Sequence, residues 1–188
     1  MFLGKQVDIK GSAHVLYTGA IDEFFHYEFG ELRYRTLDFE VHRDFGDYQG
    51  NAVLNYCSAK VPYTRVSEHK HFAPWETHDR TLIMIERARD AGRGDVLYYP
   101  MRLAQDKVKL LRYYERARQL DKVSFVGRLG TYRYLDMHIV IAESIDFAKE
   151  WLKAVADRSS RPHFPEPVYR DIDYMMASKL PDTLNKSA

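Results

Sequence analysis

The sequence predicts an α+β fold, in which an antiparallel sheet is flanked by two strand-turn-helix units, one early and one late in the chain. Strand-like segments follow one another in the middle of the chain with no helix between them, and such strands pair antiparallel. After Tyr98-Tyr99-Pro100 the apolar residues change to helical spacing, which predicts a helical region. The 188 residues are enough for one domain of ordinary size.

The early unit covers residues 1–30. Within it, Ala13–Gly19 is a short apolar run that ends in glycine, which predicts a buried strand followed by a turn. Ile21–Gly30 predicts one short helix, because Asp22 lies near its start and Gly30 lies just past its end.

The antiparallel sheet is expected in residues 31–100. In the segment from Leu32 to Arg43, alternate positions form a set with an apolar centre and arginines at its ends, which predicts a half-buried strand. That set is Arg33, Arg35, Leu37, Phe39, Val41 and Arg43. Glycine, proline and Asp/His turns separate three further predicted strands: Asn51–Ser58, Tyr63–Phe72 and Thr81–Arg87.

The late unit covers residues 101–157. Apolar residues at helical spacing predict an amphipathic helix over Gln105–Gln119 and a longer helix from Asp136 to Val155. Between them, Val123–Val126 predicts a short strand. In residues 158–188, the run RSSRPHFPEPVYRD alone holds three of the seven prolines, so we expect an irregular tail there.

Composition excludes several classes of protein. The 28 basic and 27 acidic residues give a net charge of +1, so no basic excess indicates nucleic-acid binding. One cysteine, Cys57, excludes an internal disulfide and fits a reducing compartment, and its apolar surroundings predict a small buried core residue. The N-terminal sequence lacks the long apolar run of a signal peptide or membrane helix, so a cytoplasmic protein without a membrane span is expected. The 14 tyrosines suit a sugar or nucleotide pocket, and they equally suit an ordinary core.

One segment, GRLGTYRYLDM from Gly127 to Met137, lies between the last predicted strand and the last helix. A helix N-terminus offers unpaired N–H groups to a phosphate or to the electron-rich edge of a ring. The alternative is purely structural: Gly127 and Gly130 permit a tight turn, and Asp136 caps the helix. The local pattern leaves both interpretations open.

Arg65 is a second candidate. On a strand it shares a face with Tyr63 and Ser67, and an arginine beside a tyrosine can hold a diphosphate through two parallel hydrogen bonds. A surface salt bridge is the alternative, and the pattern does not separate the two.

Motifs for other chemistries are weak or absent. In a strand, His69 and His71 would share a face, but no third ligand is evident, so no metal site is predicted. The sequence contains no GxGxxG, no P-loop and no GxSxG pattern.

Six segments in series resemble the C-terminal half of bacterial UDP-galactopyranose mutases. They are YTGAIDEFF, FGELRYRTLDFE, YQGNAVLNYC, VPYTRVSEHKHF, YYP and FVGRLGTYRYLDM, and the resemblance extends over residues 13–152. It implies an isomerase that interconverts UDP-galactopyranose and UDP-galactofuranose in polysaccharide biosynthesis. It also implies FAD, whose reduced form displaces UDP from the sugar without net redox change. The implied fold is a substrate-binding antiparallel sheet domain plus the C-terminal strand-turn-helix portion of a flavin-binding Rossmann-like domain.

The resemblance also implies roles for individual residues. Arg65, Tyr99 and Tyr134 match residues that bind the substrate diphosphate, and Asp136 matches an aspartate near the flavin that activity requires. These four are the expected catalytic residues. Asn55, Arg35 and Glu86 are expected in the substrate pocket. The expected flavin-binding residues, with Asp136, are Gly127, Arg128, Gly130 and Met137.

The family's N-terminal half, with its GxGxxG flavin loop, has no counterpart in this sequence. We therefore expect the chain to be inactive alone and to need an N-terminal half, and its first and last strands to have exposed apolar edges. The alternatives are a non-catalytic remnant or docking module of a split mutase, and another flavoprotein of amine-oxidase type. The YTR, YYP and YRYLD series argues against the last. The sequence leaves a homo-oligomer open. The loop ERARDAGRGDVL, which follows Ile85, is more basic than the family pattern.

Overall fold

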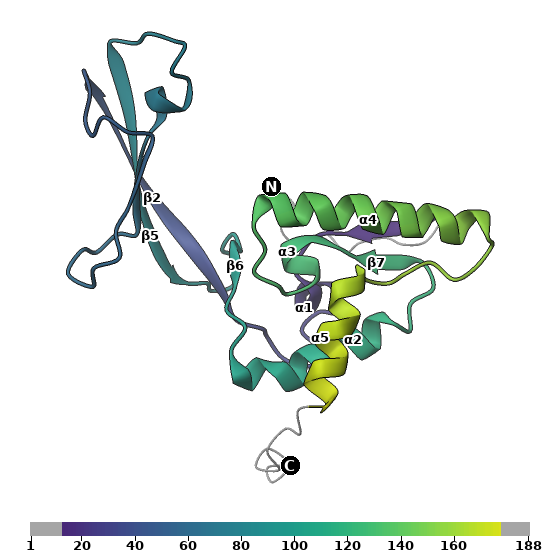
Figure 1. The fold of residues 1–188 in the computed structure, drawn as a ribbon. Coiled ribbons are helices and arrows are strands. Elements are labelled where there is room, and N and C mark those ends of the chain that lie inside the picture. Colours follow the sequence, from purple (N-terminus) through teal and green to yellow (C-terminus); the bar gives the residue numbers. More distant parts are fainter. Residues whose placement is uncertain (1–12, 178–188) are drawn as a thin grey trace. The chain divides into compact units, whose positions relative to one another are not determined.

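The computed structural model describes residues 13–177, which contain both helices and strands (Figure 1). The chain divides into two compact units: Arg35–Tyr98 forms the second unit, and the segments before and after it form the first. The antiparallel sheet together with a small parallel sheet confirms the predicted α+β fold. Among the described helices, none is long and apolar enough to cross a membrane.

The first unit is built around a short parallel strand pair. Strand β1 (Val15–Tyr17) pairs with β7 (Val123–Phe125), so residues more than 100 positions apart meet in register. The remaining elements of this unit are α1 (Ile21–Phe24), β6 (Tyr99–Pro100), the 3-10 helix η2 (Ala104–Asp106), α2 (Lys107–Ala117), α3 (Gly127–Gly130), α4 (Met137–Ala156) and α5 (Glu166–Ala177). The predicted helices at 105–119 and 136–155 are confirmed as α2 and α4.

Helix α1 is shorter than the predicted helix, which was to run as far as Gly30. Its last helical residue is Phe24, because His26 and Tyr27 take positive φ values of 51° and 59° that a right-handed helix does not allow. The N–H of Gly30 instead bonds to the carbonyl of Tyr27, which closes a turn.

The core of the first unit is aromatic. Phe125 of β7 is fully buried and stacks on Phe25 and Phe164, with ring centroids 5.7 and 5.8 Å apart. Tyr114 of α2 contacts Phe164 edge-to-face at 5.1 Å. The prediction of exposed apolar strand residues therefore holds for Leu16, which is 55% exposed, and is wrong for Phe125.

The prediction of an irregular tail after residue 157 is wrong for the described part of that segment. Glu166–Ala177 forms helix α5, and its side chains Val168, Ile172 and Met175 are buried. Ahead of the helix, the His163 carbonyl accepts a hydrogen bond from the Phe125 N–H at 2.7 Å. The segment thus covers the edge of β7 that β1 leaves open. Residues 178–188 lie outside the described part.

The second unit is an antiparallel sheet whose long strands β2 (Tyr34–Phe45) and β5 (Arg80–Asp90) form an extended ribbon (Figure 1). The short strands β3 (Val53–Asn55) and β4 (Arg65–Glu68) follow, and the 3-10 helix η1 spans His69–Phe72. The five-stranded sheet has the order β3-β4-β5-β2-β6. Nearly all of β2 belongs to the second unit with β3, β4 and β5, and β6 belongs to the first.

The burial predicted for β2 is wrong. Phe39 and Val41 were expected on a half-buried face but are 42% and 43% exposed, whereas Tyr34 and Thr36 on the opposite face are buried. On that opposite face of the sheet, Val66 and Ile83 form the small core of the unit.

Two further predictions for this unit are wrong. His69 and His71 lie in η1 rather than on a strand, because β4 ends at Glu68. Cys57 is exposed rather than buried, because β3 ends at Asn55 and Cys57 follows it in the loop.

Candidate functional site

The segment from Gly127 to Met137 begins with a tight turn against β1. Gly127 has φ +75°, and a β-carbon placed on it would meet nothing within 4 Å. Gly130 is different: its β-carbon would lie 2.8 Å from the carbonyl oxygen of Tyr17. Only glycine allows β1 and α3 to approach this closely, so at Gly130 the structural explanation accounts for the residue type.

We expect the substitution Gly130→Ala to lower the free energy of unfolding by about 1–3 kcal/mol, because the added methyl group must push α3 away from the β1 backbone. Urea denaturation of the purified chain measures this. Gly92→Ala is the control, since its φ is ordinary and its β-carbon would come no closer than 3.6 Å to Asp95. Equal midpoints for the two variants would contradict the close-packing argument.

Two buried side chains fix the second half of the segment. Tyr132 takes φ +45° and is fully buried, and its hydroxyl donates to the Arg33 carbonyl at 2.7 Å. The guanidinium of Arg133 donates to both carboxylate oxygens of Glu143, at 3.0 and 2.8 Å. With both neighbours anchored inward, Tyr134 is directed outward and is 58% exposed.

Tyr134 belongs to a cluster with Tyr99 and Arg128. The two tyrosine rings stack with centroids 5.5 Å apart and an interplanar angle of 26°. The guanidinium carbon of Arg128 lies 5.0 Å from the Tyr99 ring centre and 5.3 Å from the Tyr134 ring centre. Arg128 Nε also donates to the Leu135 carbonyl at 3.1 Å, which fixes the plane of the guanidinium. The structure thus brings together three residues for which the sequence predicted roles.

Asp136 occupies the N-cap position of α4, with extended φ and ψ, but its side chain makes no capping hydrogen bond. The adjacent Met137 is 81% exposed. The first turn of α4 therefore presents its N–H groups, an exposed carboxylate and an exposed apolar side chain together.

In the second unit, Arg65 lies in a row of side chains that crosses the sheet. Its Nε donates to Asn55 Oδ1 at 2.9 Å, and its Nη1 lies 3.6 Å from Glu86 Oε2. The strand register places Asn55 opposite Arg65, Arg65 opposite Glu86, and Glu86 opposite Phe39. Directly opposed residues share a face. We call this side of the sheet, with Asn55, Arg65, Glu86 and Phe39, the Arg65 face.

Arg35 shares the Arg65 face but makes a separate ion pair, with its Nη1 2.5 Å from Asp90 Oδ1. Both partners are exposed, so the pair contributes little to stability. Arg35, Arg65 and Asn55 are thus all on one face, but only Arg65 and Asn55 contact each other.

The sequence did not identify Phe39 as a functional residue. It lies beside Glu86 on the Arg65 face, and its ring contacts Tyr98 at a centroid distance of 6.0 Å. Its position in the strand was readable from the sequence, but its neighbours depend on a register with β5 that the sequence does not show.

In the basic segment after Ile85, the charges of Arg87 and Arg89 are paired with nearby carboxylates. Arg89 donates to Asp38 at 2.8 Å and to Asp95 at 2.6 Å, and Arg87 donates to Glu40 at 2.5 Å. The hydrogen bond from Arg89 lowers the pKa of Asp95 to about 2. These arginines hold the ribbon and its loop together on the face opposite Arg65.

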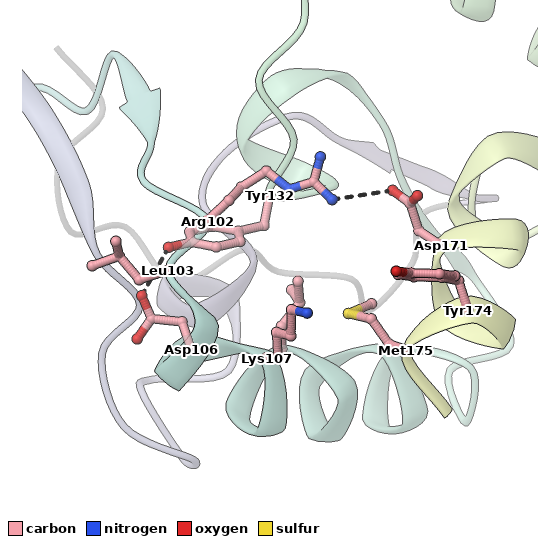
Figure 2. Close-up of a pocket in the computed structure, with 9 residues that line it drawn as sticks. Arg102, Leu103, Asp106, Lys107, Tyr132, Asp171, Tyr174 and Met175 are labelled. Atoms are coloured by element: carbon pink, nitrogen blue, oxygen red, sulfur yellow. Dashed lines mark hydrogen bonds and ion pairs between the residues drawn. The ribbon is translucent and has the colours of Figure 1, made fainter. Parts of the chain in front are cut away.

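A small cavity in the first unit lies between α2, α5 and Tyr132 (Figure 2). Arg102 and Asp171 form an ion pair of 3.6 Å across it, and Asp106 lies beneath the Tyr132 hydroxyl. Its volume of about 200 Å³ is below the roughly 300–1,000 Å³ usual for ligand pockets. None of the residues predicted for the functional site lines it.

Comparison with known proteins gives consistent matches. The family described as UDP-galactopyranose mutase matches residues 2–134. A probable UDP-galactopyranose mutase from Klebsiella pneumoniae is 49% identical over 156 residues, which cover 83% of this chain and 41% of that protein. A dTDP-fucopyranose mutase from Escherichia coli is 47% identical over 141 residues, covering 74% and 37%. A UDP-galactopyranose mutase from Mycoplasma pneumoniae is 31% identical over 145 residues, covering 74% and 36%. The chain thus spans about two fifths of the length of these relatives.

Proposed function

Since the chain belongs to the UDP-galactopyranose mutase family, we propose that it supplies the diphosphate-binding part of a flavin-dependent mutase site that interconverts UDP-galactopyranose and UDP-galactofuranose. The observation that supports this most is the cluster of Arg128, Tyr99 and Tyr134 next to the N-terminus of α4. Two phenol groups, a cation and a helix N-terminus together match the needs of a negatively charged ligand.

The proposed role of this chain is to hold the leaving group. By resemblance to the family, we assign the Tyr99 and Tyr134 hydroxyls of the first unit as donors to phosphate oxygens. In the second unit we assign the same role to Arg65, which would exchange its bond to Asn55 for bonds to phosphate. Donors fixed before the reaction stabilise the charge that develops on UDP as its bond to the sugar breaks. Glu86 lies on the side of Arg65 away from Asn55, and its ion pair with Arg65 holds the guanidinium on the Arg65 face.

The cofactor that we propose is FAD, next to one part of the first unit. There is open space at Gly127, and Asp136, Met137 and the first N–H groups of α4 lie exposed nearby. These groups would hold the flavin at its polar edge, with Arg128 as the neighbouring cation. When bound and reduced, the flavin supplies the nucleophile of the reaction. The GxGxxG pattern that holds a flavin pyrophosphate is absent from the 188 residues.

The names of the relatives support a nucleoside-diphosphate hexose as the proposed substrate class. One relative's name specifies UDP-galactopyranose and the other's specifies dTDP-fucopyranose. A diphosphate joined to a hexose is common to both, and the residues proposed here address the diphosphate. We propose the UDP-galactose pair as substrate and product, with the site in a cytoplasmic enzyme.

A non-catalytic docking module is the second candidate, favoured by exposed apolar side chains in the first unit. Leu16 of β1 and Ile141, Ile145 and Leu152 of α4 are 52–62% exposed. A parallel strand pair is normally covered on both faces. The flavin-binding half of a mutase, on the same or a separate polypeptide, would cover these side chains whether this chain is catalytic or only a docking module.

The test is to purify the 188-residue chain and record its flavin absorbance, then its turnover of UDP-galactofuranose with added FAD and dithionite. We expect a colourless protein without turnover, because the pyrophosphate of the cofactor has no binding loop here. A yellow protein with one flavin per chain, or measurable turnover, would contradict the need for a second half.

A further inference from the structure

A cluster of three metal-ligating side chains lies in the second unit, on a part of the sheet that the proposed mutase site does not use. Asp47 follows β2, Glu68 is the last residue of β4, and His71 lies in η1. Their ligand atoms all lie within 4.8 Å of one another. His71 Nε2 is 3.1 Å from Asp47 Oδ1 and 3.5 Å from Glu68 Oε2.

Glu68 is the fixed member of the cluster. Its side chain is fully buried, and its Oε1 accepts hydrogen bonds from the Thr81 hydroxyl at 2.6 Å and the Tyr48 N–H at 3.0 Å. Its Oε2 accepts the Gln49 N–H at 2.8 Å and faces His71. Burial by itself raises the pKa of Glu68, but these hydrogen bonds together lower it. Because three hydrogen bonds hold the buried carboxylate, its position is fixed before any ligand arrives.

The other two members of the cluster, Asp47 and His71, are open to solvent, and hydrogen bonds hold the backbone around them. Asp47 Oδ1 accepts the Gly50 N–H at 2.7 Å, which fixes the loop after β2. The Lys70 ammonium, next to His71 in the chain, donates to the carbonyls of Gly46 and His78 at 3.0 and 3.1 Å. Asp47 is 51% exposed and His71 is 25% exposed, so water can reach the cluster from one side.

From this arrangement we propose that Asp47, Glu68 and His71 bind a divalent transition-metal ion of the Zn²⁺ type, with water as the fourth ligand. Ligands about 2.0–2.2 Å from a tetrahedral ion lie roughly 3.4 Å from one another. The two distances from His71 Nε2, 3.1 and 3.5 Å, lie on either side of that value. One imidazole nitrogen with two carboxylate oxygens is a ligand set that Zn²⁺ accepts.

The bound ion would hold the loop after β2 and helix η1 to the end of β4. This site is separate from the Arg65 face, because Glu68 pairs with Ile83 on the opposite side of the sheet. The metal-site proposal can therefore be tested independently of the proposed mutase activity.

The test is isothermal titration of the metal-free 188-residue chain with Zn²⁺, alongside His71→Ala and Asp47→Asn. We expect one site per chain, and a loss of affinity of about tenfold or more in each variant, because His71→Ala removes a ligand and Asp47→Asn removes the charge of another. His78→Ala is the matched control: His78 also pairs with a carboxylate, Glu76 at 2.8 Å, but is not one of the three ligands, and its variant should bind Zn²⁺ like the parent chain.

Two further readouts keep the result decisive if a variant is unstable. Zn²⁺ should raise the melting temperature of the parent chain and of His78→Ala, since a ligand that binds only the folded state stabilises it. Co²⁺ should give the visible absorption bands of a four-coordinate site in the same two proteins. The absence of Zn²⁺ binding heat in the parent chain would overturn the proposal and leave His71 as a hydrogen-bonded bridge between two carboxylates. Binding that survives both ligand substitutions would also overturn it.

Discussion

The variant Arg65→Ala is expected to lower kcat/KM by roughly 100-fold or more in a complete mutase that contains this chain, because one fixed donor to the developing charge is lost. A fusion of this chain to the part of the Klebsiella pneumoniae relative that the chain does not match provides that enzyme. Turnover of UDP-galactofuranose, followed by chromatography of the two sugar nucleotides, is the measurement. The fold should persist, because Arg65 is partly exposed and its contacts are Asn55 and Glu86 at the surface of the sheet.

Two further variants test whether the effect is specific to the position of Arg65 and to the shape of its guanidinium. Arg87→Ala is the matched control, since Arg87 is equally exposed and pairs with Glu40 on the opposite face of the sheet. It should keep full activity. Arg65→Lys should recover only part of the loss, because a lysine does not bind a diphosphate through two parallel N–H groups. Equal activity losses for Arg65→Ala and Arg87→Ala would show that Arg65 acts only through the stability of the sheet.

The variant Phe164→Ala is expected to lower the free energy of unfolding by about 3–5 kcal/mol, the usual cost of emptying a large aromatic site in a core. Phe164 is fully buried and contacts Phe125 and Tyr114, so its removal leaves a cavity between β7, α2 and the segment that leads into α5. Urea denaturation followed by circular dichroism measures the change.

Tyr174→Ala, also in the C-terminal segment but 71% exposed, is the control and should stay within about 0.5 kcal/mol of the parent. A small effect of Phe164→Ala, equal to that of Tyr174→Ala, would mean that residues after 157 are not part of the core. That outcome would restore the sequence prediction of an irregular tail.

The α5 segment shows why this part of the fold was missed. The prolines of the run RSSRPHFPEPVYRD predicted an irregular tail, but Pro165 and Pro167 lie just before and within the first turn of a helix that begins at Glu166. In a first turn, proline removes an N–H that has no intrahelical partner. The apolar residues Val168, Ile172 and Met175 at helical spacing were the available signal.

The positions of the strands were predicted better than which face of the sheet is buried. Alternation in residues 32–43 located strand β2, but alternation shows two faces without showing which one is covered. In the structure, the loop with Tyr48 and Gln49 contacts Glu68 on the face opposite Arg65. This leaves Phe39 and Val41 exposed. The coverage comes from loop contacts that local periodicity does not record.

The sequence predicted which residues belong to the candidate site, but not which of them contact one another. Resemblance to the family selected Tyr99, Arg128 and Tyr134 from their local motifs, and the structure places these three side chains against one another. The roles of these residues stay predictions. The cluster at His71 could not be predicted in the same way, since Asp47 lies more than 20 residues earlier in the chain and η1 replaces the expected strand.

The most direct test of the central claim, that this chain carries part of a mutase site, is a complementation assay. Three samples are each given reduced FAD and UDP-galactofuranose: the 188-residue chain, the separately expressed part of the Klebsiella pneumoniae relative that the chain does not match, and their mixture. We expect UDP-galactopyranose only in the mixture, formed roughly 100-fold more slowly when the chain carries Arg65→Ala. Product from the chain alone, or a mixture that forms a flavin-loaded complex yet makes no product, would contradict it.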